Sequence, residues 1–427
     1  MHKILIISGG MPTSNAPKML LDMQKSLSKD YEVDLLLKYP YGDNQNIISV
    51  FNKFEYRKEI FVNMAKSFVF KFLKKFKKSK VENLPYYFFD LNEGSPKVES
   101  KKVINKIIKK YDLVIIFFWQ HLITSKTIGE IYNKLGSPIF LIAADMLPIT
   151  GGCSYFWNCQ NLKNSCGNCP GLKSNLEFDI TRKNILFKRN IFNQINIVFL
   201  SNSWVNKYAL ESNLFKNVNT IYPIIDENVF KNLNKDTLKN KYGYEGRTIL
   251  MFGSNDLFEK RKGYVFLKEA LLQLKNNKPH LLDNLLLLIV GEKRQLIGLE
   301  SFSLVQLGHV DFERLAEYYS MSDVYLSPTI QDGGPMMLNQ ALMCGTPAVA
   351  FDIGVATDII TENTGYLAKL HDSRDFYNGI VKLLELDEHN RKVMQNNCRN
   401  LMLNLSSYGA FLDRITQYYN LYKNISN

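Results

Sequence analysis

Short apolar runs alternate twice along this chain with stretches of helical length, and this alternation constrains the fold more than any other feature. Uninterrupted apolar runs of this kind are typical of strands buried on both faces of a parallel sheet. The first series predicts strands at 3–8, 33–37, 112–118, 138–144 and 196–201, with helices near 18–27 and 124–135. The second predicts strands at 248–252, 285–290, 324–327 and 348–351, with helices near 264–275, 313–321 and 336–343. Because right-handed crossovers join such strands, each series predicts a Rossmann-like, doubly wound α/β domain.

The length of the chain, 427 residues, also favours two domains, because one hydrophobic core rarely organises so many. The polar stretch 223–244 is the expected linker. We therefore expect an N-terminal domain at 1–224 and a C-terminal domain at 225–407, with a helical tail at 408–427 returning to the first. Ligands of this fold class bind at the carboxyl ends of the strands, which predicts a site in a cleft between the domains.

Charge and hydropathy limit the partners. The formal net charge is +12, which favours an anionic partner such as a nucleoside diphosphate, a nucleic acid or a membrane surface. No apolar run reaches the roughly 18 residues of a membrane span. The apolar run that begins the chain is too short for a signal peptide, so we expect a cytoplasmic protein.

The segment 323–352 holds the strongest candidate site. An expected strand ends at Pro328, a polar loop reaches Asp332-Gly333-Gly334, and Pro335 opens a helix that continues with Met336. Proline is tolerated in the first helical turn, and glycines let the backbone approach a ligand closely. Because a helix N-terminus carries free N–H groups and a partial positive charge, this loop predicts a phosphate site.

The same segment resembles the signature of the retaining glycosyltransferases of family 4, which have the GT-B fold. Those enzymes carry two acidic residues eight positions apart; Asp332 matches the first and Gln340 the second, with an amide in place of a carboxylate. The resemblance implies that Asp332 contacts the donor sugar and that Gln340 hydrogen-bonds the ribose hydroxyls. It also implies that transfer retains the anomeric configuration and needs no obligatory metal or other cofactor.

A second match to this family follows the strand at 248–252. In the family an arginine and a Lys-Gly pair hold the donor diphosphate; Lys262-Gly263 matches the pair, whereas Ser254 stands where the arginine would be. We expect Arg261 to take over that role, since departure of a diphosphate develops negative charge that cations stabilise. Gly10, after the first strand, is a further donor-binding candidate.

Four candidates lie on the acceptor side. Asp145 directly follows a predicted strand and is assigned a catalytic role, although an aspartate capping the next turn fits the pattern nearly as well. His121 follows the strand at 112–118, and Gly151 and Gly152 would offer backbone N–H groups. A single histidine in such a position is more often a packed or surface residue.

Four of the six cysteines, Cys153, Cys159, Cys166 and Cys169, fall within 17 residues, and the last two form Cys-x-x-Cys. In a reducing compartment such clustering favours a structural, tetrahedral zinc site. Two disulfides or four unliganded thiols are the alternatives.

Residues 60–80 combine phenylalanines at helical spacing with many lysines. This pattern fits either an amphipathic helix packed on its own domain or one lying on an anionic membrane. Nucleic acid is not an expected partner, because no binding motif is present.

The resemblance to this family thus implies a hexosyltransferase that uses a UDP- or GDP-linked sugar and a glycan or lipid-linked acceptor, as in surface polysaccharide or lipopolysaccharide synthesis. Two alternatives remain: a sugar-nucleotide epimerase on the same fold, and a non-catalytic subunit that binds a nucleotide sugar.

Overall fold

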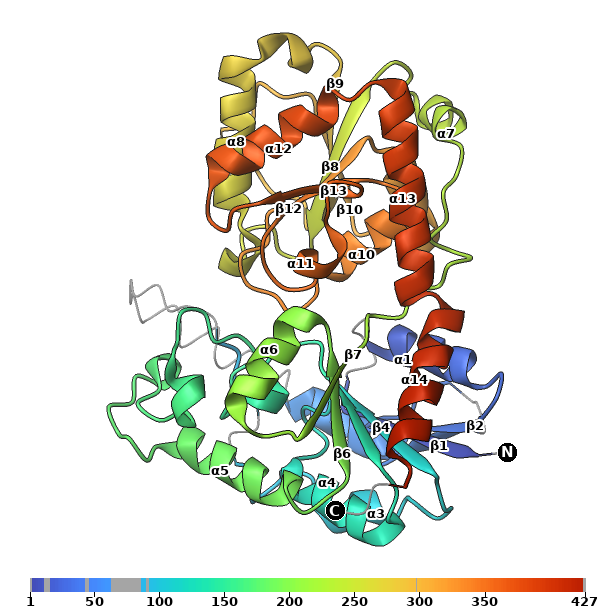
Figure 1. The fold of residues 1–427 in the computed structure, drawn as a ribbon, viewed down its shortest axis with the longest axis vertical. Coiled ribbons are helices and arrows are strands. Elements are labelled where there is room, and N and C mark those ends of the chain that lie inside the picture. Colours follow the sequence, from blue (N-terminus) through green and yellow to red (C-terminus); the bar gives the residue numbers. More distant parts are fainter. Residues whose placement is uncertain are drawn as a thin grey trace. The chain divides into compact units, whose positions relative to one another are not determined.

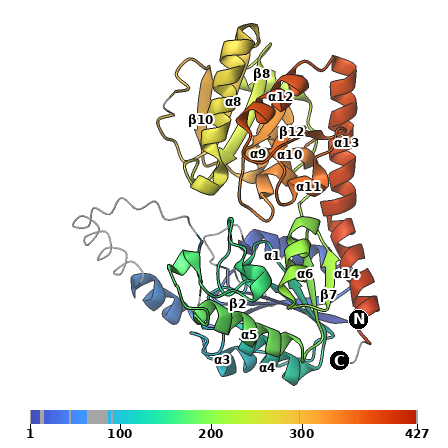
Figure 2. The same cartoon turned by 60° about the vertical axis from the view of Figure 1, so that its left-hand side comes forward.

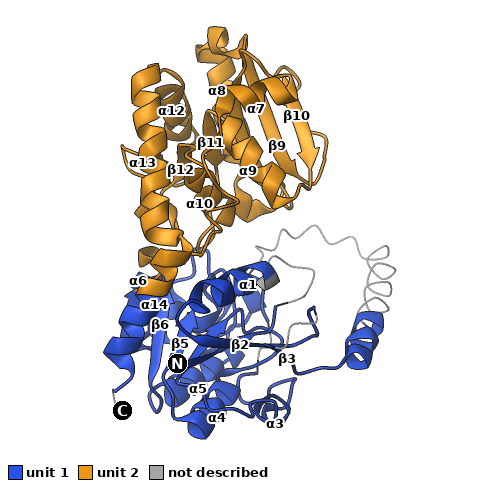
Figure 3. Ribbon diagram, turned by 90° about the vertical axis from the view of Figure 1, so that its right-hand side faces the viewer, with its two compact units in different colours: residues 1–201, 206–219, 414–427 blue, residues 202–205, 220–413 orange. Residues whose placement is uncertain are grey.

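The computed structural model describes residues 2–10, 16–42, 46–62, 86–89, 92–296 and 298–424. These residues form two compact units (Figure 3). Unit 1 comprises residues 1–201, 206–219 and 414–427, and unit 2 comprises residues 202–205 and 220–413.

Unit 1 is built on a seven-stranded sheet with the order β3-β2-β1-β4-β5-β6-β7. Its strands are β1 (Lys3–Ser8), β2 (Glu32–Leu37), β3 (Ile47–Ser49), β4 (Leu113–Phe117), β5 (Ile139–Ile142), β6 (Ile197–Ser201) and β7 (Asn217–Thr220). Its helices include α1 (Ala16–Leu27), α3 (Ser100–Ile104), α4 (Ser125–Leu135) and α5 (Ile180–Phe192), and α6 (Ser203–Ser212) follows β6 (Figure 1). Strand β1 pairs in parallel with both β2 and β4.

Unit 2 repeats this plan with six strands in the order β10-β9-β8-β11-β12-β13. The strands are β8 (Thr248–Ser254), β9 (Leu285–Gly291), β10 (Leu304–Gly308), β11 (Val324–Ser327), β12 (Ala348–Phe351) and β13 (Gly365–Ala368). The helices are α7 (Lys235–Tyr242), α8 (Tyr264–Asn277), α9 (Phe312–Met321), α10 (Met336–Met343), α11 (Ala356–Ile359), α12 (Ser373–Leu384) and α13 (Glu388–Ser406). Every strand pair of this sheet is parallel.

The central strands are buried because they are apolar along their whole length. All seven residues of β9 and all five of β4 are buried, as expected for strands covered on both faces. In unit 2, α8 and α12 pack side by side (Figure 2). The predicted class, two doubly wound α/β domains, is confirmed.

The last helix, α14 (Tyr408–Tyr422), ends in unit 1. The hydroxyls of Tyr31 and Thr416 lie 2.8 Å apart, and the Asn196 side chain donates to the backbone oxygen of Tyr422 at 2.9 Å. In β7, Asn219 donates to the hydroxyl of Tyr422 at 2.8 Å. The tail therefore returns to the first sheet, as predicted.

One expectation about the linker was wrong in part. Residues 223–244 were expected to be irregular, but α7 occupies Lys235–Tyr242. The helix is capped at both ends: the Asn234 side chain accepts from the N–H of Thr237, and Gly243 ends the helix in the left-handed region. Only Leu238 of this helix is buried, so hydrophobic periodicity gave little indication of it.

Candidate functional site

Two loops at the carboxyl ends of β8 and β11 meet in unit 2. The loop after β8 forms a 3-10 turn, Lys260–Lys262, and Gly263 then adopts a φ of 68° before α8 begins. A β-carbon at Gly263 would lie 1.8 Å from the backbone oxygen of Pro328, so only glycine allows the loops to approach this closely. The backbone N–H of Ile330 donates to the oxygen of Arg261 at 2.8 Å, which joins the two loops directly.

Across this junction the two predicted cations contact the predicted carboxylate. Asp332 Oδ2 accepts from Arg261 Nη1 at 2.5 Å and from Lys262 Nζ at 2.8 Å. Arg261 Nε also pairs with the carboxylate of Glu259. We call Glu259, Arg261, Lys262 and Asp332 the cation cluster. Its two positive and two negative charges are adjacent in space although about seventy positions separate the two parts of the chain.

The surroundings of Asp332 keep it ionised. Burial by itself would raise the pKa of this carboxyl, but the charges of Lys262 and Arg261 outweigh burial. The N–H of Gly334 adds a hydrogen bond to Oδ1 at 3.2 Å. The net pKa lies below its ordinary value, so Asp332 is a carboxylate at neutral pH.

The glycine loop leads into α10 as the sequence suggested, with one difference. Pro335 is the cap residue that precedes the helix, and Met336 is the first helical residue. The backbone oxygen of Gly333 accepts from Asn202 Nδ2 at 2.5 Å and from the N–H of Val355 at 3.1 Å. Gly333 and Gly334 are thus held in place beside the helix N-terminus, where free N–H groups favour an anion.

The two positions that depart from the family pattern have protein partners. Gln340 is buried in α10, and its Oε1 accepts from the hydroxyl of Tyr319 at 3.4 Å. Ser254, at the end of β8, donates from Oγ to the backbone oxygen of Asp256 at 3.1 Å. A serine hydroxyl is shorter than a guanidinium and carries no charge, so Arg261 is the arginine that this loop supplies.

The remaining candidates lie in unit 1, at the carboxyl ends of three neighbouring strands. Gly10 follows β1, and its N–H donates to Ser8 Oγ at 3.2 Å. His121 follows β4, has a φ of 66°, and contacts the ring of Phe89 edge-on. Asp145 follows β5. Gly10, expected to bind the donor, therefore belongs to the unit that holds the acceptor-side candidates.

Asp145 makes the capping contact that was the alternative to a catalytic role. Its Oδ1 accepts from the N–H of Leu147 at 2.9 Å, which starts the 3-10 turn Leu147–Ile149. Its Oδ2 accepts from Gln120 Nε2 at 3.1 Å, which joins the loops after β4 and β5. A capping contact and a catalytic role are compatible, because each carboxylate oxygen can accept more than one hydrogen bond.

Gly151 and Gly152 are buried over a polar network that the sequence did not reveal. Lys188, fully buried in α5, donates to the backbone oxygens of Leu147 at 2.7 Å and Thr150 at 2.9 Å. Its Nζ lies 3.3 Å from Glu93 Oε1. A buried charge is stable only when paired and hydrogen-bonded, so this lysine fixes the path of the chain from Asp145 to Gly151.

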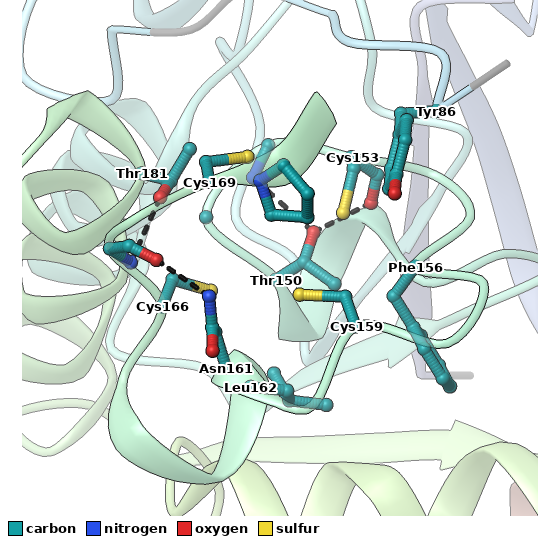
Figure 4. A pocket seen from close by; sticks show the side chains of 14 residues that line it. Tyr86, Thr150, Cys153, Phe156, Cys159, Asn161, Leu162, Cys166, Cys169 and Thr181 are labelled. Atoms are coloured by element: carbon teal, nitrogen blue, oxygen red, sulfur yellow. Dashed lines mark hydrogen bonds between the residues drawn. The ribbon is translucent and has the colours of Figure 1, made fainter. Parts of the chain in front are cut away.

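The four clustered cysteines line one pocket in unit 1 (Figure 4), and no disulfide joins any of the six cysteines, all of which lie among the described residues. Burial raises the pKa of the Cys153 thiol to about 12 and that of Cys166 to about 11. Among the described residues, no three histidine, cysteine, aspartate or glutamate side chains are already arranged to hold a metal ion.

Three residues of unit 2 join the candidate site only in the structure. Glu259 pairs with Arg261, and Asn202 supports Gly333. Gln331 is buried beside Asp332, and within the described part of the chain its Nε2 has no hydrogen-bond partner. Only the short Glu-Lys-Arg-Lys run could have drawn attention to Glu259; the other two contacts depend on tertiary structure.

The predicted membrane-binding stretch, residues 60–80, lies outside the described residues beyond position 62. No helix in the described ranges is both long and apolar enough to cross a membrane.

Part of this chain matches a known protein family. Residues 234–400, which include the whole cation cluster, match the family model "Glycosyl transferases group 1". N-acetyl-alpha-D-glucosaminyl L-malate synthase of Bacillus anthracis is 24% identical over 237 residues, 53% of this chain and 57% of that protein. The UDP-Gal:alpha-D-GlcNAc-diphosphoundecaprenol alpha-1,3-galactosyltransferase of Escherichia coli is 28% identical over 99 residues, 23% of this chain and 25% of that protein. The chain thus spans little more than half of the first relative and a quarter of the second.

A solved structure matches over nearly the whole chain. The Anabaena protein HepE, determined in complex with UDP and glucose, has a TM-score of 0.60 and 16% sequence identity. The match covers 99% of this chain and 100% of that one. At this identity the likeness establishes the fold.

Proposed function

Because this chain belongs to the group 1 glycosyl transferases and has the GT-B fold, we propose that it transfers a hexosyl residue from a nucleoside-diphosphate sugar to a glycan or lipid-linked acceptor. One observation carries this proposal: Arg261 and Lys262 converge on Asp332 beside the N-terminus of α10, inside the region that matches the family. Cations and free backbone N–H groups together suit a diphosphate.

In the proposed reaction the cations act on the leaving group. As the bond between sugar and diphosphate breaks, negative charge grows on the phosphate oxygens, and Arg261 and Lys262 stabilise it. The N–H group of Met336, at the start of α10, would add a hydrogen bond. Asp332 would position the donor sugar, and Gln340 would bind the ribose. The family resemblance supports retention of configuration, with the departing phosphate taking the acceptor's proton.

The donor class follows from the same site. HepE was determined with UDP and glucose, which supports a UDP-linked sugar here, with GDP as the other option. We assign the donor to the C-terminal domain, 225–407. The acceptor would bind the N-terminal domain, 1–224, near Asp145, His121, Gly151 and Gly152.

The acceptor is proposed to be a lipid-linked or surface-polysaccharide precursor. The Escherichia coli relative is named for a lipid diphosphate acceptor, which supports this class. A basic, phenylalanine-rich stretch at 60–80 would bring the enzyme to the cytoplasmic face of an anionic membrane.

Any metal in this chain would be structural rather than catalytic. The cysteines lie in unit 1, whereas the cation cluster lies in unit 2. Four thiolates around one zinc leave no position open for a substrate.

The direct test is to incubate the full chain with radiolabelled UDP- and GDP-hexoses and a lipid extract. Transfer or donor hydrolysis supports the proposal. A free epimer would indicate the epimerase, and binding without turnover would indicate a non-catalytic subunit; either result contradicts the proposal.

A pair of neighbouring lysines supplies the matched variants. Lys262→Ala removes a cation of the cluster and should lower kcat/KM by about 10²–10³-fold. Lys260→Ala removes an exposed lysine of the same turn and should change it less than about threefold. Equal effects of the two substitutions would refute the diphosphate assignment.

A further inference from the structure

The four clustered thiols face one interior space. Cys153, Cys159, Cys166 and Cys169 line the same pocket, and Figure 4 shows their sulfur atoms turned towards its centre from different sides. Much of the remaining lining is apolar, from Tyr86, Phe156, Leu162 and Pro170. Four soft donors around a small, largely apolar space are the ligand set that zinc prefers in structural sites.

The backbone between the last two cysteines is unusual. Ser165, Cys166, Gly167 and Asn168 all have positive φ angles, of 63°, 59°, 88° and 45°. Three of these residues are not glycine, and the left-handed region is unfavourable for each of them. Four such residues in succession bend the chain so that two thiols three positions apart point into one pocket. Hydrogen bonds from the side chains of Asn161 and Arg182 to backbone oxygens of this segment help to hold it.

Hydrogen-bond donors surround two of the sulfur atoms. The backbone N–H groups of Gly171 and Leu172 hydrogen-bond to the sulfur of Cys169, and that of Gly151 to the sulfur of Cys166. Donors of this kind orient a sulfur ligand, as the supporting hydrogen bonds of metal sites do.

Apolar packing alone does not account for the order of this loop. Residues 151–172 contain short 3-10 turns but neither an α-helix nor a named strand. The loop is instead tied to the start of α5: Asp179 accepts from the N–H of Cys169 at 2.9 Å, and Thr181 Oγ1 from that of Gly167 at 3.1 Å. A β-carbon on Gly171 would lie 2.7 to 2.9 Å from the rings of Tyr86 and Phe88.

We propose that Cys153, Cys159, Cys166 and Cys169 bind one Zn²⁺ as a tetrahedral tetrathiolate. The four thiols lose their protons to solvent as four Zn–S bonds form, and no oxidant or reductant is involved. Because no three ligand side chains in the described part of the chain are already arranged to hold a metal ion, binding requires these sulfur atoms to move closer together. Zinc thereby fixes the loop that begins at Gly151 and Gly152; its relevance to the acceptor rests on the proposed function.

Metal analysis of the full chain tests this proposal. Protein purified under reducing conditions without chelators should contain about one zinc per chain. Co²⁺ exchanged into the site should give the intense sulfur-to-metal absorption of a tetrahedral thiolate site. Cys169→Ser should abolish both signals. Cys344→Ser and Cys398→Ser, which alter buried cysteines of unit 2, should leave both unchanged.

Two results would overturn the proposal: protein without zinc in which all six thiols react after denaturation, and protein without zinc in which four thiols are blocked as disulfides. If Cys169→Ser does not fold, the wild-type chain still decides, because a chelator should remove the metal and expose the loop to protease. Nucleotide binding measured in the same sample separates this outcome from a failure of the proposed transferase.

Discussion

The two units hold their candidate residues in different ways. In unit 2 the residues are charged and contact one another: Asp332 pairs with both Arg261 and Lys262, and Glu259 pairs with Arg261. In unit 1 they are glycines, cysteines and single polar residues, supported from beneath by the buried Lys188–Glu93 pair. Under the proposed function, an arriving diphosphate would replace the partner of a cation in unit 2. No ligand can reach Lys188, whose side chain is fully buried. The ion pairs of the cation cluster in unit 2 are thus partly exposed, whereas the Lys188–Glu93 pair of unit 1 is buried.

The largest effect is expected from breaking the buried pair of unit 1. Lys188→Met leaves Glu93 buried without its cation and should lower the free energy of unfolding by about 3–5 kcal/mol. Tryptophan fluorescence during urea unfolding can measure this, because Trp119 and Trp157 both belong to unit 1. Lys102→Met is the control: its pair with Glu55 is about one-third exposed, and its loss should cost under about 1 kcal/mol. If both variants lose a similar amount of unfolding free energy, the buried pair contributes no more to stability than the partly exposed one.

The cation cluster should determine nucleotide affinity. Arg261→Ala removes a guanidinium placed for a diphosphate and should weaken UDP or GDP binding by about 10–100-fold, close to 1.5–3 kcal/mol. Calorimetry on the full chain measures this. The control is Arg314→Ala in α9, whose side chain is 67% exposed. If Arg261→Ala binds both nucleotides as well as wild type does, unit 2 does not hold the diphosphate as proposed.

Acid should destabilise unit 2 through a different buried carboxylate. Asp323 contacts Lys235, Lys239 and Arg391. Burial would raise its pKa, but the charges of these partners lower it to about 2. Because the folded pKa lies below the unfolded value of about 4, this stability is fully present above pH 4 and is lost as the pH falls towards 2.

The expected loss is about 2 kcal/mol, measured by urea unfolding at a series of pH values. Asp323→Asn should be less stable at pH 7 and should show a shallower decline between pH 4 and pH 2. A variant with the same slope as wild type would show that another group causes the acid sensitivity.

The smallest expected effect is an increase in nucleotide affinity, whereas Arg261→Ala should decrease it. Asp332→Asn keeps the shape of the side chain but removes the charge that competes for both cations. Nucleoside diphosphate should then bind about fivefold more tightly, near 1 kcal/mol, while transfer falls because the sugar is no longer positioned. Asp311→Asn, at the exposed cap of α9, is the control. Weaker nucleotide binding by Asp332→Asn would mean that the carboxylate organises the cations rather than competing with the ligand.

The strands that were predicted from the sequence lie inside the two sheets. Those that were not predicted lie at the edges. All nine predicted strands are present, and each has a neighbour on both sides. The four that were missed, β3, β7, β10 and β13, are the edges of the two sheets. Edge strands are short and partly exposed, as in β7, whose sequence is NVNT. They carry no continuous apolar run, so hydrophobic pattern could not identify them.

The residues of the candidate site also fall into two groups, those that local sequence motifs indicate and those that only the folded structure brings together. The Asp332 loop and Lys262 follow from local motifs, and the structure brings them together. The contacts of Asn202 with Gly333 and of Lys188 with Leu147 join positions 131 and 41 residues apart, and no local pattern specifies such pairs. Glycines were predicted to bind ligands, yet Gly263 is also required because two loops touch there.

The return of α14 to unit 1 has a consequence for synthesis. Unit 1 contains the first residues of the chain but also residues 414–427, so its set of contacts includes residues made after all of unit 2. During translation all residues of unit 2 are synthesised before residues 414–427. The sheet of unit 1 can therefore make its contacts with Thr416 and Tyr422 only when the chain is almost complete. A chain that ends after residue 413 would therefore contain all of unit 2 but lack the part of α14 that contacts Tyr31 and Asn196 in unit 1.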